Sequence, residues 1–137
     1  MAHSIDLYAD VVGKPVIDQL RRLGERLKDV RIVHVNSTRE GGGVAEILHW
    51  MVPLMNDLGL KASWEVIQGN DDFFSVTKNI HNGLQGHAVT LQKKDWDIYE
   101  AVNAKNSKHL EPILEDADIV VIHDPQPAAL LKLIPHR

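Results

Sequence analysis

Three short runs of β-branched and aliphatic residues alternate with amphipathic segments, and this alternation restricts the folds that the chain can adopt. The runs are "VRIVHV" at 30–35, "KASWEVIQG" at 61–69 and "DIVVIHD" at 118–124. Segments with apolar residues three or four positions apart, which is typical of helices, precede and separate them. Strands that alternate with helices predict a parallel sheet covered on both faces. We therefore expect an α/β fold, as a single domain over residues 1–137.

Proline and glycine mark the expected limits of the first two helices. Pro15 is well placed to open a helix, because its fixed φ suits the first helical position. A second helix is expected from Val44 to Leu58, and Gly59 can end it. Pro53 lies inside this second helix and should kink it, because proline has no amide hydrogen to donate.

Carboxylates mark the expected starts of the later helices. Asp71 or Asp72 is expected to cap one helix and Asp95 the next, since Asp accepts hydrogen bonds from the free amides of a first turn. Pro112 should break or kink the second of these, and "PQPAALLKLI" should begin a last short helix. The expected core-facing residues of the helix after Asp72 are Phe73, Val76, Ile80 and Leu84.

A run of glycines, Gly41 to Gly43, joins the first expected strand to the following helix. Free amides and the positive end of a helix dipole stabilise an anion, most often phosphate, at such a joint. The alternative is a loop that needs positive φ angles or close packing. Because three glycines exceed what one turn needs, we favour an anion or sugar site. Glu46 replaces the third glycine of a dinucleotide motif, and the lysine of a P-loop is missing.

The third expected strand ends in His123 and Asp124, before two prolines. Ligands of parallel sheets bind at the carboxyl ends of the strands, so the His123 ring is placed to donate a hydrogen bond to a ligand hydroxyl. Equally, His123 can cover the sheet end while Asp124 caps the next helix. The residues alone leave both interpretations open.

Lys78, His81 and Gln85 follow Phe74 at helical spacing. An aromatic ring beside hydrogen-bonding side chains suits a sugar-binding wall, but a solvated helix face is the simpler interpretation and the residues alone favour it. No metal site is expected, because the histidines lack the spacing of a zinc motif. His34, inside a strand, is expected to be a buried histidine with its hydrogen bonds satisfied.

Charge and composition exclude several classes of partner. The net charge is -4, which argues against nucleic acid, because phosphate binding needs a basic face. The chain has 0 cysteines, so disulfide and thiol chemistry are excluded. The sequence contains neither a signal peptide nor a membrane-spanning run, and we expect a cytoplasmic protein.

Four segments carry a resemblance to a known family: "HVNSTREGGGVAEILHWMVPLMNDLGL", "FFSVTKNIHNGLQG", "NAKNSKHL" and "VIHDPQPAAL". Together they resemble the N-terminal half of the trehalose glycosyltransferring synthases, which are retaining family-4 glycosyltransferases of the GT-B fold. The resemblance extends from about Val16 to Ile134. It implies a Rossmann-like domain that faces a second, donor-binding half across a cleft.

The resemblance implies a reaction and a set of site residues. A nucleotide-activated glucose gives its glucosyl group to free glucose, with retention, and the nucleotide sugar is a substrate, so that no cofactor or metal is expected. Gly41, Gly42 and Gly43 would lie against the donor phosphates and sugar. The His123 side chain would contact the transferred sugar and act in catalysis. The implied acceptor-pocket residues are Lys78, His81 and Gln85.

The chain ends soon after the third expected strand, so by the resemblance we expect that it does not include the donor-binding half. We therefore expect the chain to meet nucleotide sugar and glucose or trehalose only through that half, to be inactive alone, and to self-associate through apolar surface that truncation exposes. One alternative is another family-4 glycosyltransferase with a different acceptor. The other is a non-catalytic α/β module that binds a phosphate or a sugar.

Overall fold

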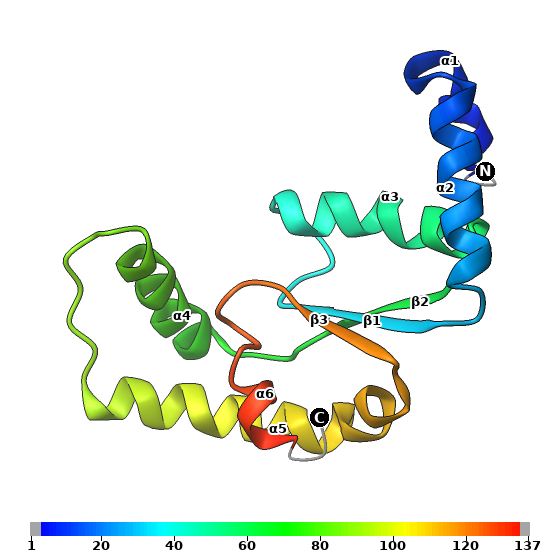
Figure 1. The fold of residues 1–137 in the computed structure, drawn as a ribbon. Helices are drawn as coiled ribbons and strands as arrows, with labels where there is room; N and C mark the ends of the chain where they lie inside the picture. The colour runs from blue at the N-terminus through cyan, green and yellow to red at the C-terminus, as the bar shows by residue number, and fades with distance from the viewer. Residues whose placement is uncertain (1–3, 135–137) are drawn as a thin grey trace.

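A computed structural model describes residues 4–134, and its centre is a parallel sheet (Figure 1). The 3 strands are β1 (Arg31–Asn36), β2 (Lys61–Val66) and β3 (Ile119–Ile122), in the order β2-β1-β3. β1 pairs in parallel with both neighbours, so the carboxyl ends of all these strands lie at one edge of the sheet. The predicted α/β fold with a parallel sheet is therefore confirmed, although β2 and β3 are shorter than the apolar runs that predicted them.

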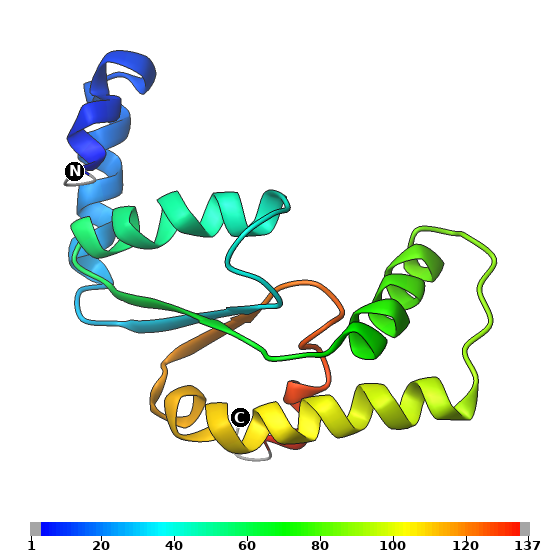
Figure 2. The same ribbon diagram turned by 180° about the vertical axis from the view of Figure 1, so that it is seen from behind.

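Helices cover both faces of the sheet (Figures 1 and 2). One face carries α3 (Gly43–Asp57), and the other carries α5 (Lys93–Asp116) and the short α6 (Leu130–Leu133). Between β2 and α5, α4 (Asp71–Leu84) packs against α5. This layered arrangement agrees with a Rossmann-like domain.

The strand alternation divides the core into two layers, because successive side chains point to opposite faces. Val33 and Val35 of β1 belong to the larger apolar cluster, which includes buried residues of α4, α5 and α6. The smaller cluster lies under α3 and consists of Ala45, Leu48 and Trp64. His34 and Asn36 alternate with the valines, so they belong to the face that α3 covers, and both are buried.

The N-terminal residues form η1 (Ile5–Tyr8), α1 (Ala9–Val12) and α2 (Lys14–Arg26), which lie beyond the C-terminal end of α3 (Figure 1). The backbone amide of Ile5 donates to the Asp57 carboxylate at 2.9 Å. A Cβ on Gly24 would collide with the Leu58 carbonyl, so this glycine permits α2 to approach α3. The described N-terminal helices lie on the opposite side of the sheet from α6 (Figure 2).

The helix starts differ from the prediction by small shifts. Asn70, not Asp71 or Asp72, caps α4 and accepts from the amide of Phe73. The N-cap of α5 is Gln92, and Asp95 is the N3 member of a capping box, so it accepts from the Gln92 amide instead of occupying the cap.

Of four further expectations about the helices, two need correction. Leu84 is 75% exposed at the end of α4, beyond the reach of the core, so its assignment to the core is wrong. Pro112 was predicted to break or kink its helix; the break is excluded, because α5 continues to Asp116, and the kink stays a prediction. Pro53 lies inside α3, as expected, and the final short helix is confirmed as α6.

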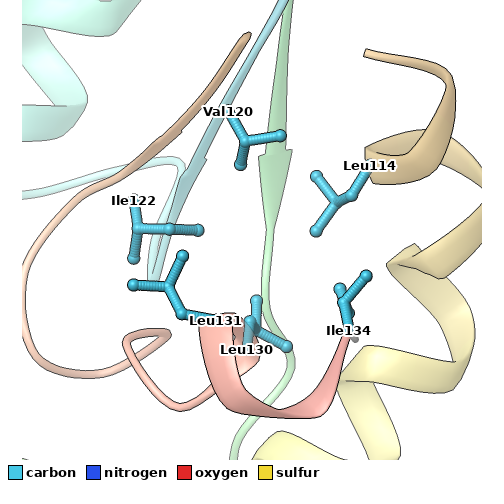
Figure 3. A pocket seen from close by; sticks show the side chains of 6 residues that line it. All are labelled: Leu114, Val120, Ile122, Leu130, Leu131 and Ile134. Atoms are coloured by element: carbon cyan, nitrogen blue, oxygen red, sulfur yellow. The ribbon is translucent and has the colours of Figure 1, made fainter. Parts of the chain in front are cut away.

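An apolar hollow lies beside β3, between α5 and α6 (Figure 3). Its lining side chains are Leu114, Val120, Ile122, Leu130, Leu131 and Ile134. β3 is an edge strand of the described sheet, and Leu131 is 65% exposed. Exposed apolar surface is thus present where it was expected, whereas the expected self-association stays a prediction.

Candidate functional site

The loops that follow β1, β2 and β3 meet at the carboxyl edge of the sheet, where ligands of parallel α/β folds bind. The first loop contains the glycine run and leads into α3 (Figure 1). The third begins at His123, whose amide donates to the carbonyl of Val35 at 2.8 Å. This bond continues the pairing of β3 with β1 by one residue. It places His123 on the same face as His34, next to α3.

Backbone conformation explains two of the glycines in the first loop but not the third. Gly41 has φ 74 and Gly42, the N-cap of α3, has φ 88, and these left-handed conformations favour glycine. Gly43 is the first residue of α3 and has no such angle. A Cβ on Gly43 would meet nothing within 4 Å. Neither backbone conformation nor packing within the described chain therefore requires a glycine at Gly43.

Two residues that sequence reasoning missed hold the base of the glycine loop. The buried Asn36 side chain donates to the Thr38 carbonyl at 2.9 Å and accepts from the Trp64 indole at 2.7 Å. Arg39 donates to the Trp64 carbonyl at 2.7 Å, and its guanidinium lies 4.6 Å from the centre of the indole ring. The loop is thus fastened to β2, while the glycines remain exposed at its tip.

His123 contacts His34 directly. The Nδ1 atom of His34 lies 3.0 Å from Nε2 of His123, and the rings are stacked with centres 5.3 Å apart. His34 is only 4% exposed, and burial, followed by repulsion from a positive charge on His123, lowers its pKa. The Nε2 atom of His34 is buried and has no hydrogen-bond partner among the described residues. The expectation of a fully satisfied His34 is therefore wrong.

The structure corrects one of the two interpretations of the third loop. Asp124 does not cap the following helix, because the N-cap of α6 is Ala129. Asp124 instead has φ 65, in the left-handed region. It therefore lies outside the right-handed α region, as predicted, but not in the extended region that a following proline favours. The interpretation in which Asp124 serves as a helix cap is thereby excluded.

A polar row on α5 fixes the second and third loops. Tyr99 donates to the Pro125 carbonyl at 2.7 Å and accepts from the Ala129 amide at 3.2 Å. Asn103 donates to the Gln126 carbonyl at 3.1 Å.

Asn106 extends this row to the second loop. It accepts from the amide of Gln68 and donates to its carbonyl, both at 2.8 Å. Sequence reasoning missed the asparagines, although residues four and seven positions after Tyr99 share its helix face. Polar side chains within the otherwise apolar stripe of this helix were the available signal.

Lys78 and His81 share one face of α4, as the spacing predicted, and Gln85 follows as the C-cap residue of the helix. The Nε2 atoms of His81 and Gln85 lie 2.9 Å apart, and Lys78 is exposed. The end of α4 points away from the sheet in both views (Figures 1 and 2). Within the described part of the chain, the hydrogen bond between His81 and Gln85 does not join this helix face to the glycine loop or to His123.

The part of the chain that the structure describes contains neither a metal-ligand cluster nor a membrane-spanning helix. Within residues 4–134, no group of at least 3 His, Cys, Asp or Glu side chains is arranged to hold a metal ion. None of the helices formed by the same residues is both long and apolar enough to span a membrane.

Comparison with known proteins identifies the family of this domain. Residues 34–137 match the family model described as "Trehalose synthase, N-terminal domain". The chain belongs to this family. The match covers the glycine loop, His123 and the polar row of α5, so the candidate site lies within the shared domain.

Curated relatives agree with this assignment. The chain is 45% identical over 131 residues to the trehalose synthase of Thermococcus litoralis, an alignment that covers 95% of this chain and 31% of that protein. It is 43% identical over 121 residues to the trehalose synthase of Rubrobacter xylanophilus, covering 88% of this chain and 29% of that protein. The chain therefore spans less than a third of the length of these two relatives.

A second group of relatives carries a different name. The chain is 33% identical over 140 aligned positions to the trehalose phosphorylase of Grifola frondosa, which covers 95% of this chain and 19% of that protein. The same domain thus occurs in proteins of two names, both of which refer to trehalose.

Proposed function

We propose that this trehalose synthase N-terminal domain is the acceptor-side part of a retaining family-4 glycosyltransferase with the GT-B fold. The reaction would transfer glucose from a nucleotide-glucose to free glucose and produce trehalose. The observation that carries the proposal is Gly43, a glycine at the start of α3 that neither its φ angle nor its packing explains. A ligand that approaches the backbone there would explain it.

The glycine loop suits the diphosphate of such a donor. Gly41, Gly42 and Gly43 are exposed, and the first amides of α3 have no partner from within the helix. The helix has 15 residues, so its dipole adds positive potential at this end. Fixed amide dipoles that face a leaving diphosphate would stabilise the charge that develops on it during transfer.

His123 is the proposed catalytic contact to the transferred sugar. Its backbone is fixed by the bond to Val35, and its ring is fixed by the contact with His34. A neutral imidazole offers one donor and one acceptor, and sugar hydroxyls can pair with either. Orientation of these hydroxyls would hold the anomeric carbon in position for transfer.

The acceptor pocket is proposed to include Lys78, His81 and Gln85, whose side chains can all hydrogen-bond to glucose hydroxyls. Because α4 points away from the strand ends, these residues would act at the outer wall of the pocket. A partner segment of the whole protein would have to close the site from the other side.

Most of the donor site is assigned to the remainder of the protein. The chain spans 31% of the length of the Thermococcus litoralis relative, and its own net charge is -4. Cationic side chains that balance a diphosphate would then come from outside the chain, and we expect no transferase activity from these residues alone. A cytoplasmic location, where nucleotide sugars are available as substrates, belongs to the same proposal.

The similarity to trehalose phosphorylases favours one second candidate function. In that reaction, inorganic phosphate would occupy the glycine loop in place of the donor diphosphate. Both candidates use the same amides, so the two reactions must be separated by substrate. Trehalose with phosphate and nucleotide-glucose with glucose should each be supplied to the full-length protein, and sugar products should be quantified.

Gly43→Ala in the full-length protein tests the proposed role of the loop. The added methyl group meets nothing within 4 Å and needs no unusual φ, so folding should be unchanged, whereas kcat/KM for nucleotide-glucose should fall about tenfold or more. Lys93→Ala is the matched control, since Lys93 is the first residue of α5 and its side chain is 88% exposed. Equal activity of both variants would show that Gly43 does not meet the donor.

A further inference from the structure

We propose that His34 is a positioning residue for the sugar-contacting His123: it occupies Nε2 of His123, leaves only Nδ1 to the ligand, and couples the tautomers of the two rings. This proposal rests on the proposed role of His123. It concerns a buried residue that the resemblance did not single out.

The two rings come together through the order of the strands. β3 pairs directly with β1, and the register joins His34 to Val121. His123 is two residues after Val121 and shares its face, so the two histidines lie diagonally on one side of the sheet. Their rings differ in plane by only 27°, and Nδ1 of His34 lies 3.0 Å from Nε2 of His123. This is hydrogen-bonding distance.

The contact allows just two neutral arrangements. If His34 donates from Nδ1, then Nε2 of His123 accepts, and His123 must carry its proton on Nδ1. If His123 donates from Nε2, then Nδ1 of His34 accepts, and His34 must carry its proton on Nε2. In both arrangements the two rings are the same tautomer, because unlike tautomers would bring two protons or two lone pairs together.

Burial restricts which nitrogen of His34 can carry the proton. Its Nε2 atom is enclosed without a partner among the described residues, and the residue is 4% exposed. Buried N–H groups without an acceptor are rarer in native proteins than under-satisfied acceptors, which favours the arrangement in which His34 donates. The Nδ1–H of His123, a half-buried residue, is then the donor available to a sugar hydroxyl.

Two polar substitutions at position 34 separate positioning from simple burial. In His34→Asn, the side-chain amide reaches about as far as imidazole Nδ1, so it can still bond to His123. In His34→Gln, the amide reaches about as far as Nε2, and the bond to His123 is lost. Both variants place an uncharged amide in the same buried site, so they are matched in polarity.

Imidazole ¹⁵N NMR spectra of the 137-residue chain test the coupling directly. At a pH where both rings are neutral, we expect His34 and His123 to show the same tautomer in the wild type. We expect His34→Asn to retain one fixed tautomer of His123 and His34→Gln to release it to a mixture. Unlike tautomers in the wild type, or an unchanged His123 spectrum in His34→Gln, would overturn the proposal.

Kinetics of the full-length protein distinguish failure of this proposal from failure of the proposed function. We expect His34→Gln to lower kcat for glucosyl transfer about tenfold with a smaller change in KM, and His34→Asn to restore most of kcat. If His123→Ala abolishes transfer but His34→Gln does not affect it, positioning by His34 is refuted and the function stands. If His123→Ala leaves transfer intact, the proposed catalytic role of His123 is refuted, whereas a wild-type protein that transfers no glucose would refute the proposed function. In both cases the NMR result alone decides whether His34 positions the ring.

Discussion

Tyr99→Phe should destabilise the domain by removing one hydroxyl group. The Tyr99 hydroxyl donates to the Pro125 carbonyl at 2.7 Å and accepts from the Ala129 amide at 3.2 Å, and Tyr99 is 8% exposed. Each such bond contributes a net stabilisation of about 0.5–1.5 kcal/mol, so the loss of both should lower the free energy of unfolding by about 1–3 kcal/mol. The ring and its stacking on Phe73 stay in place, which confines the change to the third loop.

Urea denaturation followed by circular dichroism measures this loss. With an m-value of about 2 kcal/mol/M for a small domain, the midpoint should fall by about 0.5–1.5 M. Tyr8→Phe is the control, because Tyr8 is 39% exposed at the end of η1, far from this loop. If the two variants had the same midpoint, the hydroxyl of Tyr99 would not hold the loop that begins at His123.

Three other predictions follow from buried or exposed groups. The pKa of His34 is lowered from 6.5 by burial and by His123. Among the described residues, His123 is the one ionisable neighbour that contributes to this shift. The strand neighbours of His34, Trp64 and Val121, do not titrate in this range. At this position the unfolded chain therefore binds more protons than the folded chain. The free energy of unfolding should then fall as pH drops below about 6.5, by at most about 1.4 kcal/mol per pH unit. Urea midpoints between pH 5 and 7.5 check this, and an equal slope in His34→Asn would contradict it. Gly24→Ala should cost about 1–3 kcal/mol, because its methyl group collides with the Leu58 carbonyl, and a thermal midpoint like that of the wild type would show that α2 can shift away. The chain should self-associate through the hollow beside β3, so light scattering should give a mass that rises with concentration in the wild type and less in Leu131→Glu; a constant monomeric mass in both would refute this.

The apolar patterns of the sequence were sufficient to predict the sheet. Residues 30–35, 61–69 and 118–124 each overlap a strand, because β-branched runs between helical segments leave few other structures. Helix starts were less certain, since Asn70, Asp71 and Asp72 are adjacent and all three can cap. Only the backbone geometry decides among them, and it selects Asn70.

Features of the candidate site that follow a single strand could be predicted from the sequence. Contacts between side chains of two neighbouring strands could not. The glycine run and His123 each follow a single strand, so their place at the carboxyl edge follows from the chain order. The contact of His34 with His123 requires β3 beside β1, and local sequence patterns do not specify strand order. Asn103 and Asn106 were not predicted, because polar residues of an amphipathic helix are usually exposed and only the packing shows that these two are buried.

The polar row of α5 has a further consequence for motion. Asn106 holds Gln68 in the second loop, while Tyr99 and Asn103 hold the third loop, so two segments distant in sequence share one rigid support. Local opening of either loop disturbs the same helix, and segments that share a support tend to open as one cooperative unit. The amides of Gln68 and Ala129 should then exchange with solvent deuterium at similar protection, and a ligand that orders one loop would slow exchange in the other.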